Sequence, residues 1–472
     1  MAVNPGLADL LRYPLMSALA ERRTRRIARG TSLSSGSLSH TSTNDPAPLT
    51  ALEEAVIVVS TGLTGPVMHD GPLKRPDGGD ELGSPFLNVV GRTASSPDNS
   101  HATSFFLIND RGIWLLRRPS DREALQLLAS LPGKWEDWSD DDWLRAAETV
   151  KVQVSDKRLE FPRTFPYYLG WNKQTSNVPG TTILMPVVDC TRQYINAIFT
   201  MLSEPDGQRP VVIDDWQEFH PADLAEAAVW VGAQFGFPTK IPYQPIGGIK
   251  WVQNGFCNPD ISAPLGFSHA LRTDYEAFFL LQNLMLLAQA MGLGGWIHSS
   301  VFAPWVLQRD PAKGWFGLGF RMEVPDKKWV RWPPVPSTQP NPVGIDGVLE
   351  GLCPPYVGSM NEAVDILIGE KYGPQGMYGD AATFAAPFKK DADAKEYLRL
   401  QVPFSPLAIE YTKEICTYLF EKYGRFPAHV DAFYVPGIWV QFSHLELEYY
   451  EKYYKASLVQ RQAAHAANWE ES

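Results

Sequence analysis

Cysteine is scarce in this sequence, which has 4 cysteines among 472 residues. They lie far apart and include no Cys-x-x-Cys pair. Small disulfide-stabilised domains and zinc ribbons need more closely spaced cysteines, so we expect neither. A reducing compartment is the simplest interpretation. The four are Cys190, Cys257, Cys353 and Cys416.

Long apolar runs are also missing. A helix that crosses a bilayer needs roughly 20 predominantly apolar residues, and no stretch approaches that length. The first residues lack the charged-then-apolar layout of a secretory signal. Residues 22–42 are rich in Arg and Ser, as transit peptides are, but Glu21 and the motif described below argue against one. We therefore expect a cytoplasmic protein with no membrane partner.

Positive charge is in deficit, because 42 Lys and Arg face 53 Asp and Glu and leave a net charge of -11. Binding to a phosphate backbone depends on clustered positive charge, so nucleic acid is not an expected partner. Apolar material is plentiful: 44% of the residues are hydrophobic and 20% are charged. These fractions are typical of a globular protein and suffice for a large core or two smaller ones.

The local patterns predict both helices and strands. Residues 104–108 and 113–116 are β-prone and flank Asn-Asp-Arg-Gly, which predicts a hairpin. Thr273 and Glu276 form a capping-box pattern ahead of a helix that is apolar almost all round, and glycines 292 and 294 end it. Such a helix is buried in a core or a dimer interface. Further helices are expected from residue 14, over 49–60, over 406–423 and from residue 445, and strands over 182–188, 210–213 and 432–442.

These signals favour an α+β fold and divide the chain into five segments. The segment 120–262, rich in aromatic residues, is interpreted as an insertion or subdomain, whose aromatic side chains are candidates for a substrate lid or simply for a core. The five are an N-terminal helix and flexible arm (1–48), the first part of the core (49–119), the insertion (120–262), the second part of the core (263–310), and a C-terminal excursion with a dimer-wrapping segment (311–472).

A basic cluster follows the first expected helix. It comprises Arg22, Arg23, Thr24 and Arg26. If the helix continues through it, Arg22 and Arg26 project from one face, where two guanidinium groups can bind one dianion while Thr24 adds a donor. The cluster thus predicts a site for a phosphate monoester. A solvated basic helix end is the alternative.

Two further segments suit a flat ligand. The polar loop at residues 91–99 can offer hydroxyl, amide and backbone groups to a heteroaromatic ring, although an ordinary polar turn has the same composition. Residues 282–299 combine a helix, a glycine-rich end and a strand whose N–H groups can approach such a ring. A helix end followed by a buried strand is the alternative for this segment.

In this order, the three segments resemble the nitroreductase superfamily. Arg22-Arg23-Thr24-Arg25-Arg26 is similar to the family's Arg-Arg-Ser-x-Arg motif, and residues 52–66 resemble the following helix and its Ala-Pro-Ser turn, with Val59 in place of the proline. The polar loop is similar to the Ser/Pro/Gly loop of azoline-oxidising relatives. Gln-Asn-Leu-Met at 282–285, ending in Gly-Leu-Gly, is the most specific match. The resemblance covers residues 10–118 and 263–305.

The resemblance implies a homodimeric, nitroreductase-like fold: a mixed, mainly antiparallel sheet flanked by helices, with FMN held between the two subunits. It implies an FMN-dependent oxidoreductase that acts on a planar small-molecule substrate, with NADH or NADPH as a candidate electron donor. The implied cofactor-binding residues are Arg22, Arg23, Thr24, Arg26, Ser95, Ser96, Pro97, Asp98, Asn99, Gly294, Gly295, Trp296, Ile297, His298, Ser299 and Arg425.

Two positions depart from the family pattern. His298, with serines after it, stands where relatives often place Gly or Glu beside flavin N5. It is therefore the one candidate catalytic residue, as a proton donor, with a packed, hydrogen-bonded histidine as the alternative. The basic residue that relatives supply for the phosphate near the C-terminus has three candidates here, Lys389, Lys390 and Arg425.

Several alternatives stay open. One alternative is a binding or scaffold protein that keeps the fold without flavin. His429, Asp431 and His444 offer two histidines and one carboxylate for a metal ion. Within the enzyme interpretation, nitro or quinone reduction, dehalogenation and oxidation of a biosynthetic intermediate fit equally well, and fold does not fix the substrate or the direction of electron flow.

Overall fold

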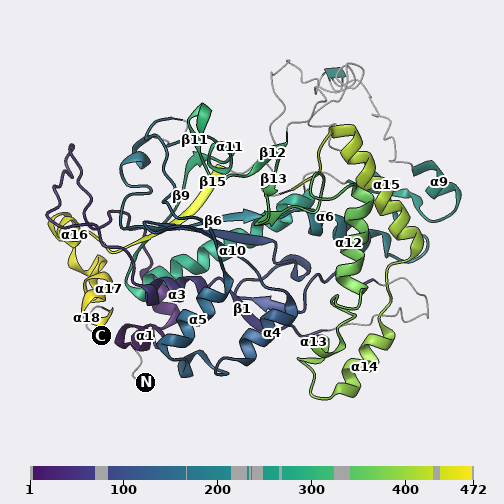
Figure 1. Cartoon of the computed structure of the whole chain (residues 1–472), viewed down its shortest axis with the longest axis horizontal. Coiled ribbons are helices and arrows are strands. Elements are labelled where there is room, and N and C mark those ends of the chain that lie inside the picture. The colour runs from purple at the N-terminus through teal and green to yellow at the C-terminus, as the bar shows by residue number, and fades with distance from the viewer. Residues whose placement is uncertain are drawn as a thin grey trace.

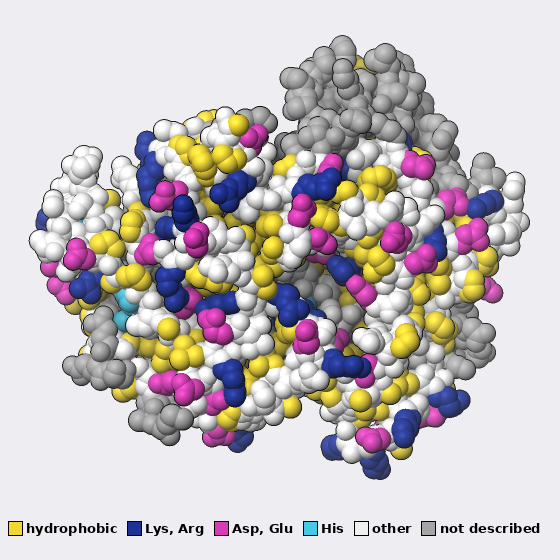
Figure 2. Space-filling view, in the orientation of Figure 1, with side chains coloured by type: hydrophobic (Ala, Val, Ile, Leu, Met, Phe, Trp, Pro, Cys, Tyr) yellow, Lys and Arg dark blue, Asp and Glu magenta, His cyan; other side chains and the backbone are white. Residues whose placement is uncertain are grey.

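The computed structural model describes residues 4–69, 83–165, 167–168, 170–213, 231–232, 235, 248–264, 268–323, 341–428 and 436–469. Within these ranges the chain combines helices with a mainly antiparallel sheet, which confirms the predicted α+β class. In the part of the chain described, no helix has both the length and the apolar character needed to cross a membrane. Figure 2 shows acidic and basic side chains interspersed over the face in view, without a large patch of one sign.

A six-stranded sheet in the order β5-β4-β3-β6-β15-β9 lies at the centre of the molecule (Figure 1). All of its pairings are antiparallel. The predicted hairpin is confirmed, since β3 and β4 pair from Phe105–Leu116 to Asn109–Gly112. Because β9 is an edge strand, its outer side is open to a further segment. The strands are β3 (Thr103–Asn109), β4 (Gly112–Leu116), β5 (Lys151–Ser155), β6 (Thr182–Val188), β9 (Gly294–Phe302) and β15 (Pro436–Ser443).

Both faces of this sheet are covered. Alternate residues of β3 point to opposite sides, so Phe105 and Leu107 pack with α3, α5 and α10 while Phe106 and Ile108 pack against residues 159–168 and α11. Figure 1 shows α3, α5 and α10 together on one side of the sheet. These helices are α3 (Ala51–Val59), α5 (Asp140–Val150), α10 (Ser268–Met291) and α11 (Ala303–Leu307).

The long apolar helix α10 differs from its prediction at one end. It begins at Ser268, so Thr273 is a buried residue inside it and not its N-cap. The carboxylate of Glu276 is used elsewhere: it accepts hydrogen bonds from the backbone N–H of Thr103, at 2.9 Å, and from the hydroxyl of Ser96. The predicted C-terminal end is confirmed, because Gly292 follows the helix with φ at +83°.

A second helical body lies beside the sheet and forms its own core. It consists mainly of α6 (Thr191–Leu202), α12 (Met360–Tyr372) and α15 (Pro406–Tyr423). Both predicted ends of α15 are confirmed: Ser405 caps it ahead of Pro406, and Gly424 ends it with φ at +66°. Figure 1 shows α6, α12 and α15 grouped to the right of the sheet.

The range expected to be an insertion contributes directly to the main fold. β5 and β6 both come from residues 120–262, and β6 is an inner strand of the central sheet. α5, from the same range, packs against α3. The aromatic residues Trp138 and Trp143 are buried in the core there, which agrees with the core alternative for them.

The remaining elements are short and connect or cover these layers. They are α1 (Pro5–Leu10), α2 (Leu15–Glu21), β1 (Leu63–Pro66), β2 (Val90–Arg92), α4 (Asp121–Ala129), β7 (Pro210–Ile213), α9 (Gly248–Gln253), β8 (Asn258–Pro264), β10 (Arg309–Asp310), β11 (Trp315–Phe316), β12 (Arg321–Glu323), β13 (Asn341–Ile345), β14 (Leu349–Glu350), α13 (Ala381–Ala385), α14 (Asp391–Leu400), α16 (Leu447–Tyr453), α17 (Gln460–Ala463) and α18 (His465–Trp469), with single 3-10 turns at Pro97–Asn99, Trp135–Asp137, Gly170–Gln174, Pro311–Lys313 and Ala456–Leu458.

Candidate functional site

The basic cluster is not helical. α2 ends at Glu21, and its C-cap Arg22 has φ −53° and ψ 127°. The chain then runs along the open edge of β9, where the backbone N–H of Arg25 donates to the carbonyl of Gly295 at 3.2 Å. The prediction that Arg22 and Arg26 project from one helix face is therefore wrong. The sheet edge provides backbone partners that a continued helix would have supplied internally.

The cluster does meet the start of β9, as the resemblance implied. The guanidinium of Arg26 lies 5.8 Å from the ring centre of Trp296. Arg25, which was not among the candidates, is buried and donates to the Gln289 side chain at 2.9 Å and to the carbonyl of Leu458 at 2.8 Å. Its hydrogen bonds fasten the cluster to α10 and to the C-terminal segment.

A cavity of about 570 Å³ opens beside this segment. Its volume lies in the range of small-molecule sites. Three arginines line it, and no acidic residue does so among the residues that the structure describes. Arg22 is not part of the lining. The lining residues are Arg23, Thr24, Arg25, Arg26, Ile27, Leu33, Ser35, Leu38, Gln174, Thr175, Tyr449, Tyr450, Tyr454, Leu458 and Val459.

Tyr450 holds the basic segment in place. Its hydroxyl oxygen accepts hydrogen bonds from the backbone N–H groups of Arg26, at 3.0 Å, and Ile27, at 3.2 Å. Burial raises the pKa of this phenol, so it is neutral at physiological pH. The N-terminal arm closes the same region, because Glu446 accepts hydrogen bonds from Gly30, Ser42 and Asn44. Figure 1 shows the arm beside α16.

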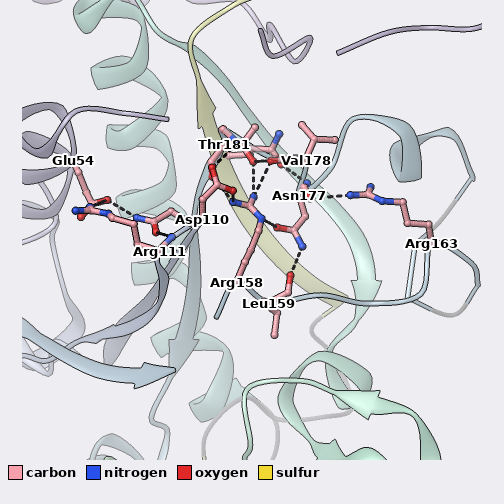
Figure 3. Close-up of polar contacts among 12 residues, drawn as sticks. Glu54, Asp110, Arg111, Arg158, Leu159, Arg163, Asn177, Val178 and Thr181 are labelled. Atoms are coloured by element: carbon pink, nitrogen blue, oxygen red, sulfur yellow. Dashed lines mark hydrogen bonds and ion pairs between the residues drawn. The ribbon is translucent and has the colours of Figure 1, made fainter. Parts of the chain in front are cut away.

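A hydrogen-bonded network around Arg158 and Asn177 (Figure 3) extends to the cavity wall at Thr175. Arg158 donates to Asp110 at 2.9 Å and to Asn177 at 3.0 Å. The backbone N–H of Asn177 in turn donates to Gln441, whose side-chain amide donates to the carbonyl of Thr175 at 2.9 Å. Thr175 lines the cavity, so the hairpin turn at Asp110 and the strand β15 together position this wall.

His298 is packed rather than poised to donate a proton. Its ring stacks on Trp296 with 3.6 Å between centres, and its Nε2 accepts a hydrogen bond from the indole N–H of Trp439. Burial, and then the charge of Arg26, lower the pKa of His298 well below its usual value. The side chain is therefore a neutral imidazole at pH 7, which favours the alternative of a packed histidine.

The glycines at the start of β9 allow close packing of the protein with itself. A Cβ on Gly294 would lie 2.3 Å from the Leu445 side chain, and one on Gly295 would lie 2.8 Å from Cβ of Ala288. Further along the strand, Ile297 is 36% exposed and Ser299 pairs with Ile438 of β15. Close contact with Leu445 at Gly294, and with α10 at Gly295, thus explains these glycines without a ligand.

The polar loop at residues 95–99 lies at the opposite end of α10. It contacts Glu276 through Ser96, whereas the basic segment contacts Gln289 through Arg25. At about 1.5 Å per residue, these two points on α10 are about 20 Å apart. One chain therefore does not bring the loop residues Ser95, Ser96, Pro97, Asp98 and Asn99 to the arginine-lined cavity.

Ser100 and His101, which directly follow the loop, line a second cavity of about 480 Å³. Four basic and four acidic side chains line it, and they pair: Arg118 with Asp121 at 2.7 Å, Arg122 with Asp380 at 2.8 Å, and Arg192 with Glu370 at 2.8 Å. The remaining two are Asp189, at 3.2 Å from Arg192, and Lys371.

The loop beside this second cavity has an unusual backbone conformation and contains a buried histidine. Asp98, Asn99 and His101 have φ of 51°, 49° and 48°, which is uncommon for residues other than glycine. The His101 ring is buried, and neither of its nitrogens has a hydrogen-bond partner among the described residues. Burial, then the charges of Arg118 and Arg92, lower the pKa of His101 to about 2.

The predicted basic residues of the C-terminal third lie away from the arginine-lined cavity. Arg425 follows α15 directly, is buried, and lines neither cavity. Lys389 and Lys390 are exposed just ahead of α14. Of the proposed metal ligands, His429 and Asp431 lie outside the described residues. His444 faces Glu53 and His465, two residues that no local motif singles out.

The sequence comparisons assign no family, because no family model and no curated protein matches this chain.

Proposed function

We propose that this protein is an FMN-dependent oxidoreductase of nitroreductase type, and that its FMN binds in the arginine-lined cavity. One observation carries the proposal: the basic segment, which Arg25 fastens to Gln289 near the C-terminal end of α10, contributes three arginines to a cavity that has no acidic side chain in its described lining. A phosphate monoester carries about two negative charges, and guanidinium groups match its geometry.

The residues of this cavity divide into those that bind and those that position. Arg23, Thr24 and Arg26 are the proposed phosphate donors. Arg25 is committed to Gln289 and Leu458, so it holds the segment in place. Tyr449 and Tyr454 provide aromatic walls that exclude water from a planar ring. FMN, when bound, supplies the hydride and electron transfer, and no side chain of this cavity is assigned as an acid or base.

The proposed enzyme is a homodimer. Apolar side chains are exposed along α10 and along α2, which packs against it. Leu15 and Met16 are 65% and 72% exposed, and Phe279 is 50% exposed. A second subunit on this surface would cover them, and it is the route by which the loop at residues 95–99 reaches the FMN of its partner.

The first experiment measures the absorption spectrum of the purified protein and its titration with FMN, followed by anaerobic reduction with NADH and with NADPH. Bound flavin with visible absorption, bleached by a nicotinamide donor, is the expected result. A colourless protein that does not take up added FMN would favour the flavin-free alternative and end the proposal. Arg22→Ala, outside the lining, is the matched control for substitutions within it.

Sedimentation velocity tests the dimer. Phe279→Glu places a charge on the exposed face of α10 and should produce monomers. Leu407→Glu, on a side chain that is 44% exposed on α15, is the control and should leave the wild-type state unchanged. If both variants and the wild type sediment as monomers, the proposed exchange of the loop between subunits is excluded.

A further inference from the structure

Two histidines and a glutamate from distant parts of the chain converge on one point. Glu53 lies on α3, His444 follows β15, and His465 begins α18. Oε1 of Glu53 is 3.0 Å from Nε2 of His444 and 2.6 Å from Nε2 of His465. The side chain of Glu53 is 1% exposed, and those of the histidines are 11% and 5% exposed. This group is separate from both cavities.

The other nitrogen of each ring determines where its proton lies. Nδ1 of His444 is 3.1 Å from the carbonyl oxygen of Ala47, and Nδ1 of His465 is 2.8 Å from that of Met291. A carbonyl oxygen only accepts, so both Nδ1 atoms carry the proton. In a neutral imidazole, Nε2 then presents a lone pair. Two lone pairs therefore point at a carboxylate oxygen, which is itself only an acceptor.

The glutamate is oriented for the same point. Its second oxygen, Oε2, accepts the backbone N–H of Thr50 at 2.6 Å as part of the helix cap. Its first oxygen, Oε1, faces the two histidines. If both Nε2 atoms also carried protons, each could donate a hydrogen bond to Glu53, but both rings would then be imidazolium cations. Two buried positive charges would face one carboxylate, which leaves one positive charge uncompensated in the interior. A divalent cation satisfies all three lone pairs at once.

We propose that Glu53, His444 and His465 bind a divalent metal ion, with Zn²⁺ as the first candidate. Two imidazoles and a carboxylate form a donor set that Zn²⁺ uses in proteins. The Nδ1–H to carbonyl bonds are the outer contacts that ordinarily orient metal-bound histidines. At bond lengths of about 2.0–2.1 Å, tetrahedral ligands stand about 3.3 Å apart, so the two Nε2–Oε1 separations widen by less than about 1 Å on binding.

The ion fastens the C-terminal segment to the core. His465 belongs to α18, which packs on α1, and Glu53 belongs to α3 beneath the sheet. The burial of the three side chains fits a structural ion rather than one that meets a substrate. The same C-terminal segment carries the tyrosines of the arginine-lined cavity, so removing the ion should loosen that wall.

Metal content of the full chain tests this proposal. The protein is purified without a histidine tag, dialysed against EDTA, and titrated with Zn²⁺ or Co²⁺ alone, while elemental analysis, Co²⁺ absorption and thermal unfolding are recorded. We expect about one metal ion per chain and a melting temperature that rises when Zn²⁺ is returned. His465→Gln and Glu53→Gln should weaken binding at least about 100-fold, since each deletes a direct ligand.

Two control variants test whether metal loss is specific to the cluster. His101→Gln and Glu276→Gln remove a buried histidine and a buried glutamate outside the cluster, and both should keep the metal. Flavin absorption, read on the same samples, separates this proposal from the FMN proposal. A wild-type protein that holds no metal, before EDTA or after titration, overturns the site. If the cluster variants do not fold, anomalous diffraction of Zn²⁺-loaded wild type decides: an ion elsewhere, or none, also overturns it.

Discussion

The two cavities at the ends of α10 differ in charge more than in size. Their volumes are about 570 and 480 Å³. The cavity at the C-terminal end has three arginines and, among described residues, no acid. The cavity at the N-terminal end has four basic side chains facing four acidic ones. Each cavity has three arginines in its lining, but described acidic lining residues face them only in the second cavity.

The difference in charge pairing also predicts that substitutions of charged residues will affect the free energy of unfolding differently in the two cavities. In the paired cavity, each of the three arginines has an acidic partner, and removal of that partner leaves the arginine charge uncompensated. In the arginine-lined cavity, like charges lie close together, and no described acidic lining residue offsets them. Residues kept for a ligand ordinarily cost stability in its absence. Four predictions test this contrast.

The largest effect is expected for FMN affinity. Arg23→Ala with Arg26→Ala should weaken FMN binding by about 10²–10⁴-fold, because two charge-assisted hydrogen bonds are lost at about 1.5–3 kcal/mol each. Fluorescence titration measures it. Arg118→Ala with Arg192→Ala removes two arginines from the other cavity and should change the affinity by less than about threefold. Equal losses in both pairs would show that the contrast has no functional meaning.

Stability should respond in the reverse order. The Asp121 carboxylate accepts the backbone N–H groups of Val89 and Val90 and pairs with Arg118. Asp121→Ala should therefore lower the free energy of unfolding by about 2–4 kcal/mol, since it leaves a partly buried arginine and two N–H groups without their acceptor. Urea unfolding provides the measurement. The pair Arg23→Ala with Arg26→Ala serves as the comparison and should stay within about 1 kcal/mol of wild type.

Local patterns predicted the elements whose signals are complete within a few residues. The hairpin at Asn109–Gly112 and the helix from Pro406 to Tyr423 needed only turn residues, a cap and a terminal glycine. The start of α10 was misplaced because Glu276 binds Ser96 and Thr103 instead of capping its own helix. That choice depends on a strand far away in the sequence, which no local pattern contains.

The candidate site shows the same division. The sequence placed Arg23, Thr24 and Arg26 in one cluster, and the structure brings that cluster to β9. The sequence alone could not show that the cluster has an extended conformation. Its backbone pairs with the edge of a strand near residue 295, which is far away along the chain. Glu53 and His465 are separated by most of the chain, so only the fold brings them together with His444.

Lowering the pH should destabilise the folded protein through His101, which lines only the second cavity. Its folded-state pKa is about 2, against an ordinary 6.5. Between these values the unfolded chain holds a proton that the folded chain does not, so stability falls as the pH falls through this window. The slope approaches about 1.36 kcal/mol per pH unit, or about 2 kcal/mol between pH 6 and 4.5. Urea unfolding of wild type and His101→Gln at several pH values should show a wild-type curve that is steeper by this slope, because buried His298 contributes equally to both curves. Parallel curves would mean that His101 is protonated in the folded protein.

The smallest effect concerns the polar loop, whose side chains are committed within its own chain. The Ser96 hydroxyl donates to Glu276 and accepts the backbone N–H of His101 at 2.9 Å. Ser96→Ala should lower the free energy of unfolding by about 1–2 kcal/mol, because a hydrogen bond to a charged group is lost. FMN affinity should remain within about threefold of wild type, since this hydroxyl has no capacity left for a partner's flavin. Ser95→Ala, on an exposed neighbour, is the control for stability. A loss of FMN affinity in Ser96→Ala without loss of stability would contradict this prediction and would show that the Ser96 hydroxyl itself, rather than other groups of the loop, binds the partner's flavin.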